Sequence, residues 1–196
     1  MRKEFLSYQA VRNGAIKLAN RIHGEGFFPD VIYVSLRGGA YMGNVLSEYF
    51  KIKRRDRRPV YYAAVVARSY RDIGLQDRVR VDGWTYSPEY LRSGDKVLLV
   101  DDIFDTGRTV NHLVEIIMDQ GIPREDVRVA VHDYKIRKYL GKQMPVQPDY
   151  WCRKHELTTP EEDFWIHYTS HELVGLTEGE KKEHYYAEDP ELSGIF

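Results

Sequence analysis

The sequence predicts a single α/β domain with a central, mostly parallel sheet flanked by helices. Apolar strand-like runs alternate with helical patterns along the chain, and two of these runs end in a glycine-containing turn that opens a helix. The length of 196 residues, with 42% hydrophobic and 30% charged residues, suits one domain that is large enough for a full core.

Composition excludes several classes of protein. A formal net charge of −1 gives no overall attraction to nucleic acid or anionic lipid. The single cysteine, Cys152, excludes an intrachain disulfide framework and a cysteine-based zinc site. Residues 1–4 are expected to lead into a mixed helix, and no apolar run approaches the roughly 18 residues of a membrane span. We therefore expect a cytoplasmic protein without membrane contact.

The first part of the chain predicts a helix and then a strand, a turn and a second helix. Apolar residues at helical spacing cover residues 10–22, and this pattern ends near Gly24. A short apolar strand follows at 31–35. The segment 36–39 contains two glycines, and a second helix is expected around 42–50.

The central part repeats this alternation. A strand is expected over 60–67, followed by a polar segment, 68–95, that is long for a connection and is interpreted as a functional lid. The next strand covers 97–100 and leads to a helix at 110–118, and a further strand covers 127–132. Strands that alternate with helices predict a parallel sheet.

The segment 97–109 combines a buried strand, two acids and a small-residue turn. The turn at 105–109 opens a helix, so free backbone N–H groups, two hydroxyls and the positive helix end converge on one anion. In open α/β sheets the ligand lies at the carboxyl ends of such strands. Asp101 and Asp102 would repel a bare phosphate, so the ligand is expected to carry hydroxyls or a bound cation as well.

This segment resembles the signature of the type I phosphoribosyltransferases: an apolar strand, two acids, two apolar residues and then Asp-Thr-Gly-x-Thr. The resemblance implies the type I fold and binding of phosphoribosyl pyrophosphate with Mg²⁺. Asp101 and Asp102 would face the ribose hydroxyls and hold the metal directly or indirectly. The 5′-phosphate would be bound by the loop that follows, Asp105, Thr106, Gly107, Arg108 and Thr109.

The turn after the first strand resembles the pyrophosphate loop of the same family. Gly38 and Gly39 let the backbone approach a diphosphate, and Arg37 adds a charged fork. In many members the bond before this basic residue is cis, so the Leu36–Arg37 bond is a candidate for a cis peptide.

Two further stretches resemble the 6-oxopurine branch of the family. Ser69 and Tyr70 resemble the pair that opens the flexible catalytic loop, although Tyr70 also fits a plain strand-end aromatic. A small C-terminal hood, residues 133–178, is expected to hold the base.

Four residues of this hood are implied to bind the base. Lys135 would donate to the 6-oxo group, Trp165 would stack on the purine, and the main chain of Ile166 would accept from the ring. Glu172 would contact the base edge or a metal. The alternatives are a solvated Lys135, a core Trp165 and a solvated Glu172.

The resulting interpretation is a Mg²⁺-dependent purine phosphoribosyltransferase, with Asp101, Asp102 and Asp105 as the catalytic acids and Asp105 near purine N7. The core covers about 8–132, the oligomer is expected to be a homodimer or homotetramer, and the tail at 179–196 has no assignable chemistry. The alternatives are a phosphoribosyl pyrophosphate-sensing regulator of the same fold, or a transferase for another base. The basic run at 51–58 favours a solvated or subunit-interface role, and nucleic acid is an unlikely partner.

Overall fold

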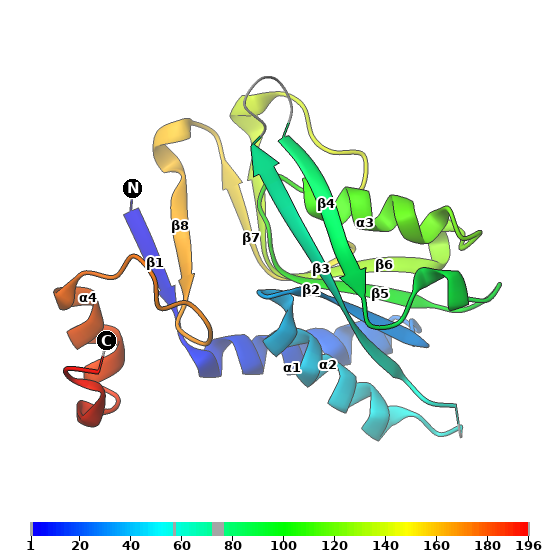
Figure 1. The fold of residues 1–196 in the computed structure, drawn as a ribbon, viewed down its shortest axis with the longest axis horizontal. Helices are drawn as coiled ribbons and strands as arrows, with labels where there is room; N and C mark the ends of the chain where they lie inside the picture. Colours follow the sequence, from blue (N-terminus) through cyan, green and yellow to red (C-terminus); the bar gives the residue numbers. More distant parts are fainter. Residues whose placement is uncertain (1, 57, 72–76, 196) are drawn as a thin grey trace.

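The protein folds around two sheets (Figure 1). The structure is a computed structural model that describes residues 2–56, 58–71 and 77–195; for residues 69–71, 77 and 78 it describes the backbone only. Within these residues, a six-stranded sheet has the order β4-β3-β2-β5-β6-β7, and a two-stranded sheet pairs β1 with β8. The strand pairs are parallel, except for the antiparallel pair β3 and β4. The strands are β1 Arg2–Leu6, β2 Val31–Leu36, β3 Tyr61–Arg71, β4 Asp77–Trp84, β5 Val97–Phe104, β6 Val127–Arg137, β7 Tyr150–Leu157 and β8 Phe164–Tyr168.

Helices cover both faces of the large sheet (Figure 1). On one face lie α1 and α2, and on the other lies α3, so each face buries its own apolar cluster. In α3 the buried residues Val110, Leu113, Val114 and Ile117 follow helical spacing, which explains why this segment packs as a helix. The helices are α1 Tyr8–Gly24, α2 Gly39–Lys53, α3 Arg108–Met118 and the short α4 Glu178–Lys181, which continues as a π-helical turn over Lys182–Tyr186. Short 3₁₀ turns cover Pro88–Tyr90, Arg124–Asp126, Lys138–Leu140, Pro160–Glu162 and Pro190–Leu192.

The predicted fold class and the alternation of strands and helices are confirmed. Strands β5 and β6 are longer than predicted, because pairing continues past their apolar centres. β5 runs through the acids to Phe104, with Ile103 opposite Asp133 of β6. Lys135 therefore lies within β6 and is buried, whereas the sequence placed it just beyond the strand.

The start of the chain differs from the prediction. Residues 2–6 form strand β1 rather than leading directly into a helix, and β1 pairs with β8. The helix begins at Tyr8, where the side chain of Ser7 accepts from the N–H of Ala10. The smaller sheet therefore combines the two ends of the chain. Within the stretch expected to form the hood, β7 instead lies at the edge of the large sheet.

Part of the long connection expected over 68–95 forms strand, because residues 68–71 belong to β3 and residues 77–84 form β4. β3 extends to Arg71 and pairs with β4, with Ser69 opposite Val79. Residues 72–76, at the tip of this pair, lie outside the described residues.

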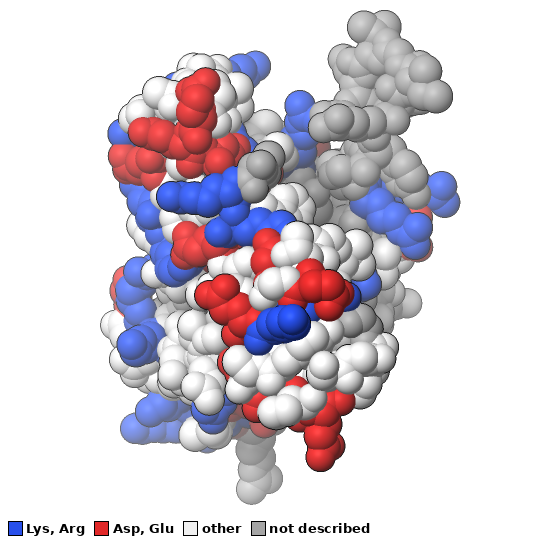
Figure 2. All heavy atoms as spheres, turned by 90° about the vertical axis from the view of Figure 1, so that its left-hand side faces the viewer, with Lys and Arg blue, Asp and Glu red and all other residues white. Residues whose placement is uncertain are grey.

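Charged side chains of both signs are interspersed on the face that carries β1, β8 and the C-terminal helices (Figure 2). The basic run around 51–58 lies at the end of α2 and in the loop that follows, and residue 57 is outside the described part. Part of the run is neutralised locally, because Lys51 contacts Glu48 and Arg54 contacts Asp30. Among the described residues, no helix has the length and apolar character needed to cross a membrane.

Candidate active site

The turn after β2 packs directly against the acids of β5. The Leu36–Arg37 peptide bond is cis, which confirms the expectation from the sequence. A Cβ atom on Gly38 would lie 2.1 Å from the Asp102 carboxylate, and one on Gly39 would lie 2.5 Å from the carbonyl oxygen of Val100. Only glycine permits this approach, so the turn and the carboxylate pair form one surface.

The acid pair lies near the carboxyl end of β5, in partly buried positions. The Asp102 N–H donates to the Asp101 carboxylate at 3.0 Å, and the Ile103 N–H donates to the Asp102 carboxylate at 2.8 Å. Burial, followed by the adjacent charge of Asp102, raises the pKa of Asp101 well above its ordinary value. A polyhydroxyl or cationic ligand would relieve this crowding of negative charge.

The turn between β5 and α3 has the geometry of an anion site. Gly107 has a φ of +76°, and a Cβ there would meet the ring of Phe104. Asn111 anchors the turn, since its side-chain amide donates to the Gly107 carbonyl at 2.9 Å and to the Val146 carbonyl at 2.8 Å. Residues 106–109 therefore form a fixed turn at the start of α3, where the first N–H groups of a helix have no partner within the helix.

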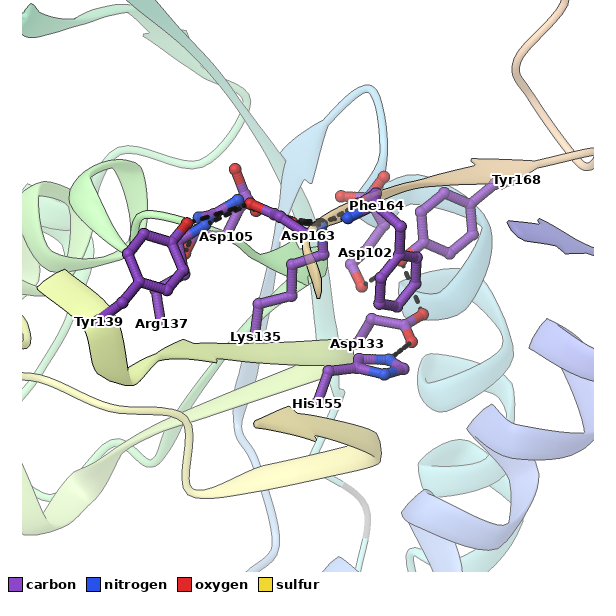
Figure 3. A network of polar contacts seen from close by, with 10 residues as sticks. All are labelled: Asp102, Asp105, Asp133, Lys135, Arg137, Tyr139, His155, Asp163, Phe164 and Tyr168. Atoms are coloured by element: carbon purple, nitrogen blue, oxygen red, sulfur yellow. Dashed lines mark hydrogen bonds and ion pairs between the residues drawn. The ribbon is translucent and has the colours of Figure 1, made fainter. Parts of the chain in front are cut away.

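Asp105 precedes this turn and contacts β6 (Figure 3). Its carboxylate accepts from Arg137 at 2.6 Å, and its backbone carbonyl accepts from the same guanidinium at 2.9 Å. The Lys135 ammonium lies 3.7 Å from the Asp105 carboxylate. Lys135 is buried and donates to the Asp163 carboxylate at 2.9 Å and to the carbonyl of Phe164. It is therefore a structured, ion-paired lysine, not a solvated one.

Of the two expected base-binding residues of β8, Trp165 borders a cavity and Ile166 does not. Trp165 is 53% exposed, and its indole N–H donates to the Glu172 carboxylate at 3.3 Å. The ring is therefore held by a hydrogen bond but is not buried in the core. Ile166 is buried beside it. A cavity of about 690 Å³ separates this strand from the glycine turn; it is lined by Lys3, Arg37, Gly38, Asp102, Trp165, His167, His171, Glu172, Leu173, Val174 and Gly175.

Ser69 and Tyr70 lie on the backbone of β3, and their side chains are outside the described part of the structure. Their predicted contact with the ligand stays a prediction.

Three residues that contact the predicted acids were missed by the sequence reasoning. Arg137 holds Asp105, His171 lies 3.4 Å from the Asp102 carboxylate, and the Tyr168 hydroxyl donates to the Asp102 carbonyl at 3.1 Å. Arg137 could have been found from the spacing of Asp133, Lys135 and Arg137, because residues two apart in a strand share one face. For His171 and Tyr168 the sequence carries no comparable signal.

The buried carboxylate of Asp133 accepts hydrogen bonds from several residues next to the site (Figure 3). Asp133 accepts from His132 at 2.7 Å, His155 at 2.7 Å, Arg153 at 2.6 Å and Tyr168 at 2.8 Å. Burial alone would raise the pKa of Asp133, but the hydrogen bonds from the two histidines outweigh it and hold the pKa below its ordinary value. The single O–H of Tyr168 lies within hydrogen-bond distance of both the Asp133 carboxylate and the backbone carbonyl of Asp102, so it links Asp133 to the strand that carries the acid pair.

The donor set at the acid pair fits Mg²⁺ when a substrate supplies the remaining ligands. Asp101 and Asp102 offer hard carboxylate oxygens, whereas no cluster of three or more His, Cys, Asp or Glu residues suited to a metal occurs among the described residues. Mg²⁺ is commonly held by one or two carboxylates together with substrate phosphates, rather than by a cage made only of protein.

Comparison with known proteins agrees with this architecture. The sequence profile of the phosphoribosyl transferase domain matches residues 1–159. The chain is 29% identical over 161 residues to the Bifunctional protein PyrR of Halalkalibacterium halodurans, covering 76% of this chain and 82% of the relative. It is 26% identical over 154 residues to the xanthine phosphoribosyltransferase of Bifidobacterium adolescentis, covering 64% and 79% of the two chains.

Solved structures show the same fold. The purine phosphoribosyltransferase of Pyrococcus horikoshii superposes with a TM-score of 0.66 at 21% identity, covering 90% of this chain and 99% of the other. The fold is thus the type I phosphoribosyltransferase fold that the 97–109 segment predicted. The chain belongs to the phosphoribosyl transferase family and is a phosphoribosyltransferase.

Proposed function

We propose that the protein transfers ribose 5-phosphate from phosphoribosyl pyrophosphate to N9 of a 6-oxopurine, as a cytoplasmic purine-salvage enzyme. The observation that carries this proposal is the placement of Lys135 and Trp165. The ammonium of Lys135, on β6, lies 3.7 Å from the Asp105 carboxylate. The exposed indole ring of Trp165, on β8, borders the cavity. An oxygen acceptor on a flat heterocycle suits this pair.

The chemistry follows from charge placement. The N9 lone pair forms a bond to C1 of the ribose, the bond from C1 to the pyrophosphate oxygen breaks, and the proton that the base loses from N7 passes to Asp105. Asp101 and Asp102 bind the ribose hydroxyls and balance the positive charge that develops on the sugar, while Arg37 and the Gly38–Gly39 backbone hold the leaving pyrophosphate. Mg²⁺, held by Asp101 and Asp102, would supply neutralisation of the diphosphate charge.

The hydrogen bonds of Lys135 support recognition of an oxo group. An ammonium has three N–H donors. One donates to Asp163 and another to the Phe164 carbonyl, and the Asp105 carboxylate is 3.7 Å from the ammonium, so the third N–H is the one that would donate to a base oxygen bound beside Asp105.

The edge of β8 supports recognition of the purine ring by the main chain. The Thr169 N–H bonds to Leu6 of β1, so the odd-numbered residues of this segment face β1. The Phe164 carbonyl instead faces Lys135, and the carbonyl of Ile166, two residues on, points to the same edge.

The proposal is tested by comparing how far each substitution lowers kcat/KM for different bases. We expect Trp165→Ala to weaken all purines together, because stacking contributes about 1–3 kcal/mol regardless of ring substituents. Lys135→Ala should weaken 6-oxopurines and leave adenine no worse, because a hydrogen bond from a charged group contributes about 1.5–3 kcal/mol only when its acceptor is present. The measurement is kcat/KM for hypoxanthine, guanine, xanthine and adenine.

Thermal unfolding of both variants serves as the folding control. Equal losses across hypoxanthine, guanine and adenine in a folded Lys135→Ala protein would remove the 6-oxopurine assignment.

The phosphate turn gives a separate prediction. Thr109→Val deletes a hydroxyl at the start of α3 and should raise the KM for phosphoribosyl pyrophosphate by about tenfold, with kcat largely kept, because the lost contact to a charged group is made in the ground state. Steady-state kinetics with varied phosphoribosyl pyrophosphate measure this effect. An unchanged KM would mean that the phosphate is held elsewhere.

An alternative to transfer is supported by the similarity to PyrR, which is named a bifunctional protein. The candidate is a regulator of the same fold that senses phosphoribosyl pyrophosphate. Such a regulator needs the phosphate turn but does not need Lys135 and Trp165, so tight phosphoribosyl pyrophosphate binding without turnover on any base would favour it.

A further inference from the structure

Four charged residues around the candidate base site form a closed array, defined here as Asp105, Lys135, Arg137 and Asp163 (Figure 3). Arg137 donates to Asp105 at 2.6 Å and, through Nε, to Asp163 at 2.7 Å. Lys135 completes the array by contacting Asp163 at 2.9 Å and approaching Asp105 at 3.7 Å. Two cations and two carboxylates thus alternate in space, and their formal charges cancel.

Arg137 is the member that holds Asp105 most firmly. It contacts both the carboxylate and the backbone carbonyl of Asp105, so it fixes the side chain and the peptide together. The Arg137 side chain is only 14% exposed, whereas that of Asp105 is 43% exposed. A half-exposed carboxylate on a turn has several rotamers open to it, and a two-point contact from a rigid strand removes most of them.

Electrostatics supports a permanent contact. Burial alone would lower the pKa of the Arg137 guanidinium, but hydrogen bonds to Asp163 and Asp105 outweigh it and raise the pKa above its ordinary value. Burial alone would likewise raise the pKa of Asp163, but hydrogen bonds from Arg137 and Lys135 lower it to about 2. Both partners are therefore charged at neutral pH.

The array also joins two elements that are far apart in the sequence. Asp105 follows β5, whereas Asp163 directly precedes β8, the strand that carries Trp165. The guanidinium of Arg137 bridges them from β6. A displacement of either element would break one of its contacts.

We propose that Arg137 is a positioning residue that holds the Asp105 carboxylate toward the base and fixes its distance from the β8 stacking surface. This inference rests on the proposed role of Asp105 as the proton acceptor of the base. It predicts an effect on the chemical step rather than on binding of phosphoribosyl pyrophosphate, because Arg137 is not among the residues expected to bind that substrate, which are 36–39, 69, 70, 101, 102 and 105–109.

Chemical rescue tests the proposal. We expect Arg137→Ala to lower kcat by at least about tenfold, because misplacement of a reacting group by about 1 Å can cost up to about 100-fold in rate. The KM for phosphoribosyl pyrophosphate should stay within about twofold. Guanidinium chloride, added below concentrations that unfold the protein, should raise the kcat of Arg137→Ala severalfold, while sodium chloride at equal ionic strength should not.

Two further variants complete the design. Arg137→Lys keeps a charge but not the two-point fork, so its kcat should lie between those of Arg137→Ala and the wild type, and it stands in if Arg137→Ala does not fold. Lys138→Ala is the matched control, because Lys138 is the neighbouring cation and contacts Glu156 rather than Asp105. Its removal should change neither kcat nor the KM for phosphoribosyl pyrophosphate.

Three results overturn the inference: a wild-type kcat in folded Arg137→Ala, a loss that guanidinium does not restore, or a wild-type kcat in Arg137→Lys when Arg137→Ala does not fold. The base used in all assays is the one that the wild type accepts best. A wild type that prefers a base other than a 6-oxopurine therefore overturns the proposed function alone, while an absence of transfer to any base overturns both.

Discussion

Asp105→Asn is expected to lower kcat by about 100-fold or more, while phosphoribosyl pyrophosphate still binds. General acid–base catalysis by a positioned side chain typically contributes about 10²–10⁴-fold, and an amide cannot take up the N7 proton. The Asn side chain keeps the size of Asp and one acceptor for Arg137, so the turn at 105–109 should keep its shape. Steady-state kinetics with both substrates varied measure the effect.

The matched control is Asp119→Asn, the same substitution at the end of α3, outside the site. It should leave kcat unchanged. A kcat close to wild type in Asp105→Asn would remove Asp105 from the catalytic role and would place proton transfer on another group or on solvent.

Asp133→Asn is expected to destabilise the fold by about 3–5 kcal/mol, the usual cost of breaking a buried ion pair by removing one partner. The Asp133 side chain is 0% exposed and faces Arg153, His132 and His155. Urea unfolding of the wild type and the variant at neutral pH measures the difference. Glu156→Gln is a control, since Glu156 is an exposed carboxylate of the neighbouring strand β7 and its loss should change the free energy of unfolding little.

The pH dependence has a definite sign. The folded state holds the pKa of Asp133 below the value of about 3.9 that is usual in an unfolded chain, so the contribution of this carboxylate is present above pH 4 or so and is lost as the pH falls toward the folded value. The difference in free energy of unfolding between the wild type and Asp133→Asn should therefore become smaller as the pH falls from about 5 to about 3. A difference in free energy of unfolding that grows as the pH falls would contradict the negative charge assigned to Asp133.

The core of the fold could be predicted from local pattern. The apolar strand at 97–100 and the helical spacing of 110–118 need no long-range information, and both are confirmed. The glycine turn at 36–39 and its cis bond followed from the family resemblance, and the bond is confirmed.

The rest of the fold and of the site depends on contacts between residues that are far apart in the sequence. Strand β1 has mixed polarity and pairs with β8, about 160 residues away, so the strand conformation of residues 2–6 carries no local signal. The ion pairs of Arg137 join strands and turns that only the folded sheet brings together. Asp133, Lys135 and Arg137 stand at every second position of β6 and so share a face, but the sequence does not indicate which carboxylate that face meets.

The most direct test of the central claim is an assay of the wild-type protein with phosphoribosyl pyrophosphate, Mg²⁺ and a panel of bases: hypoxanthine, guanine, xanthine, adenine, uracil and orotate. Nucleoside monophosphate formation and pyrophosphate release are measured together. The account predicts equimolar formation of both products with at least one 6-oxopurine, at a higher kcat/KM than with uracil or orotate. The kcat/KM should be at least about tenfold higher than with adenine, since adenine lacks the oxo acceptor for Lys135, which contributes about 1.5–3 kcal/mol. Preferred transfer to uracil, orotate or adenine would contradict it.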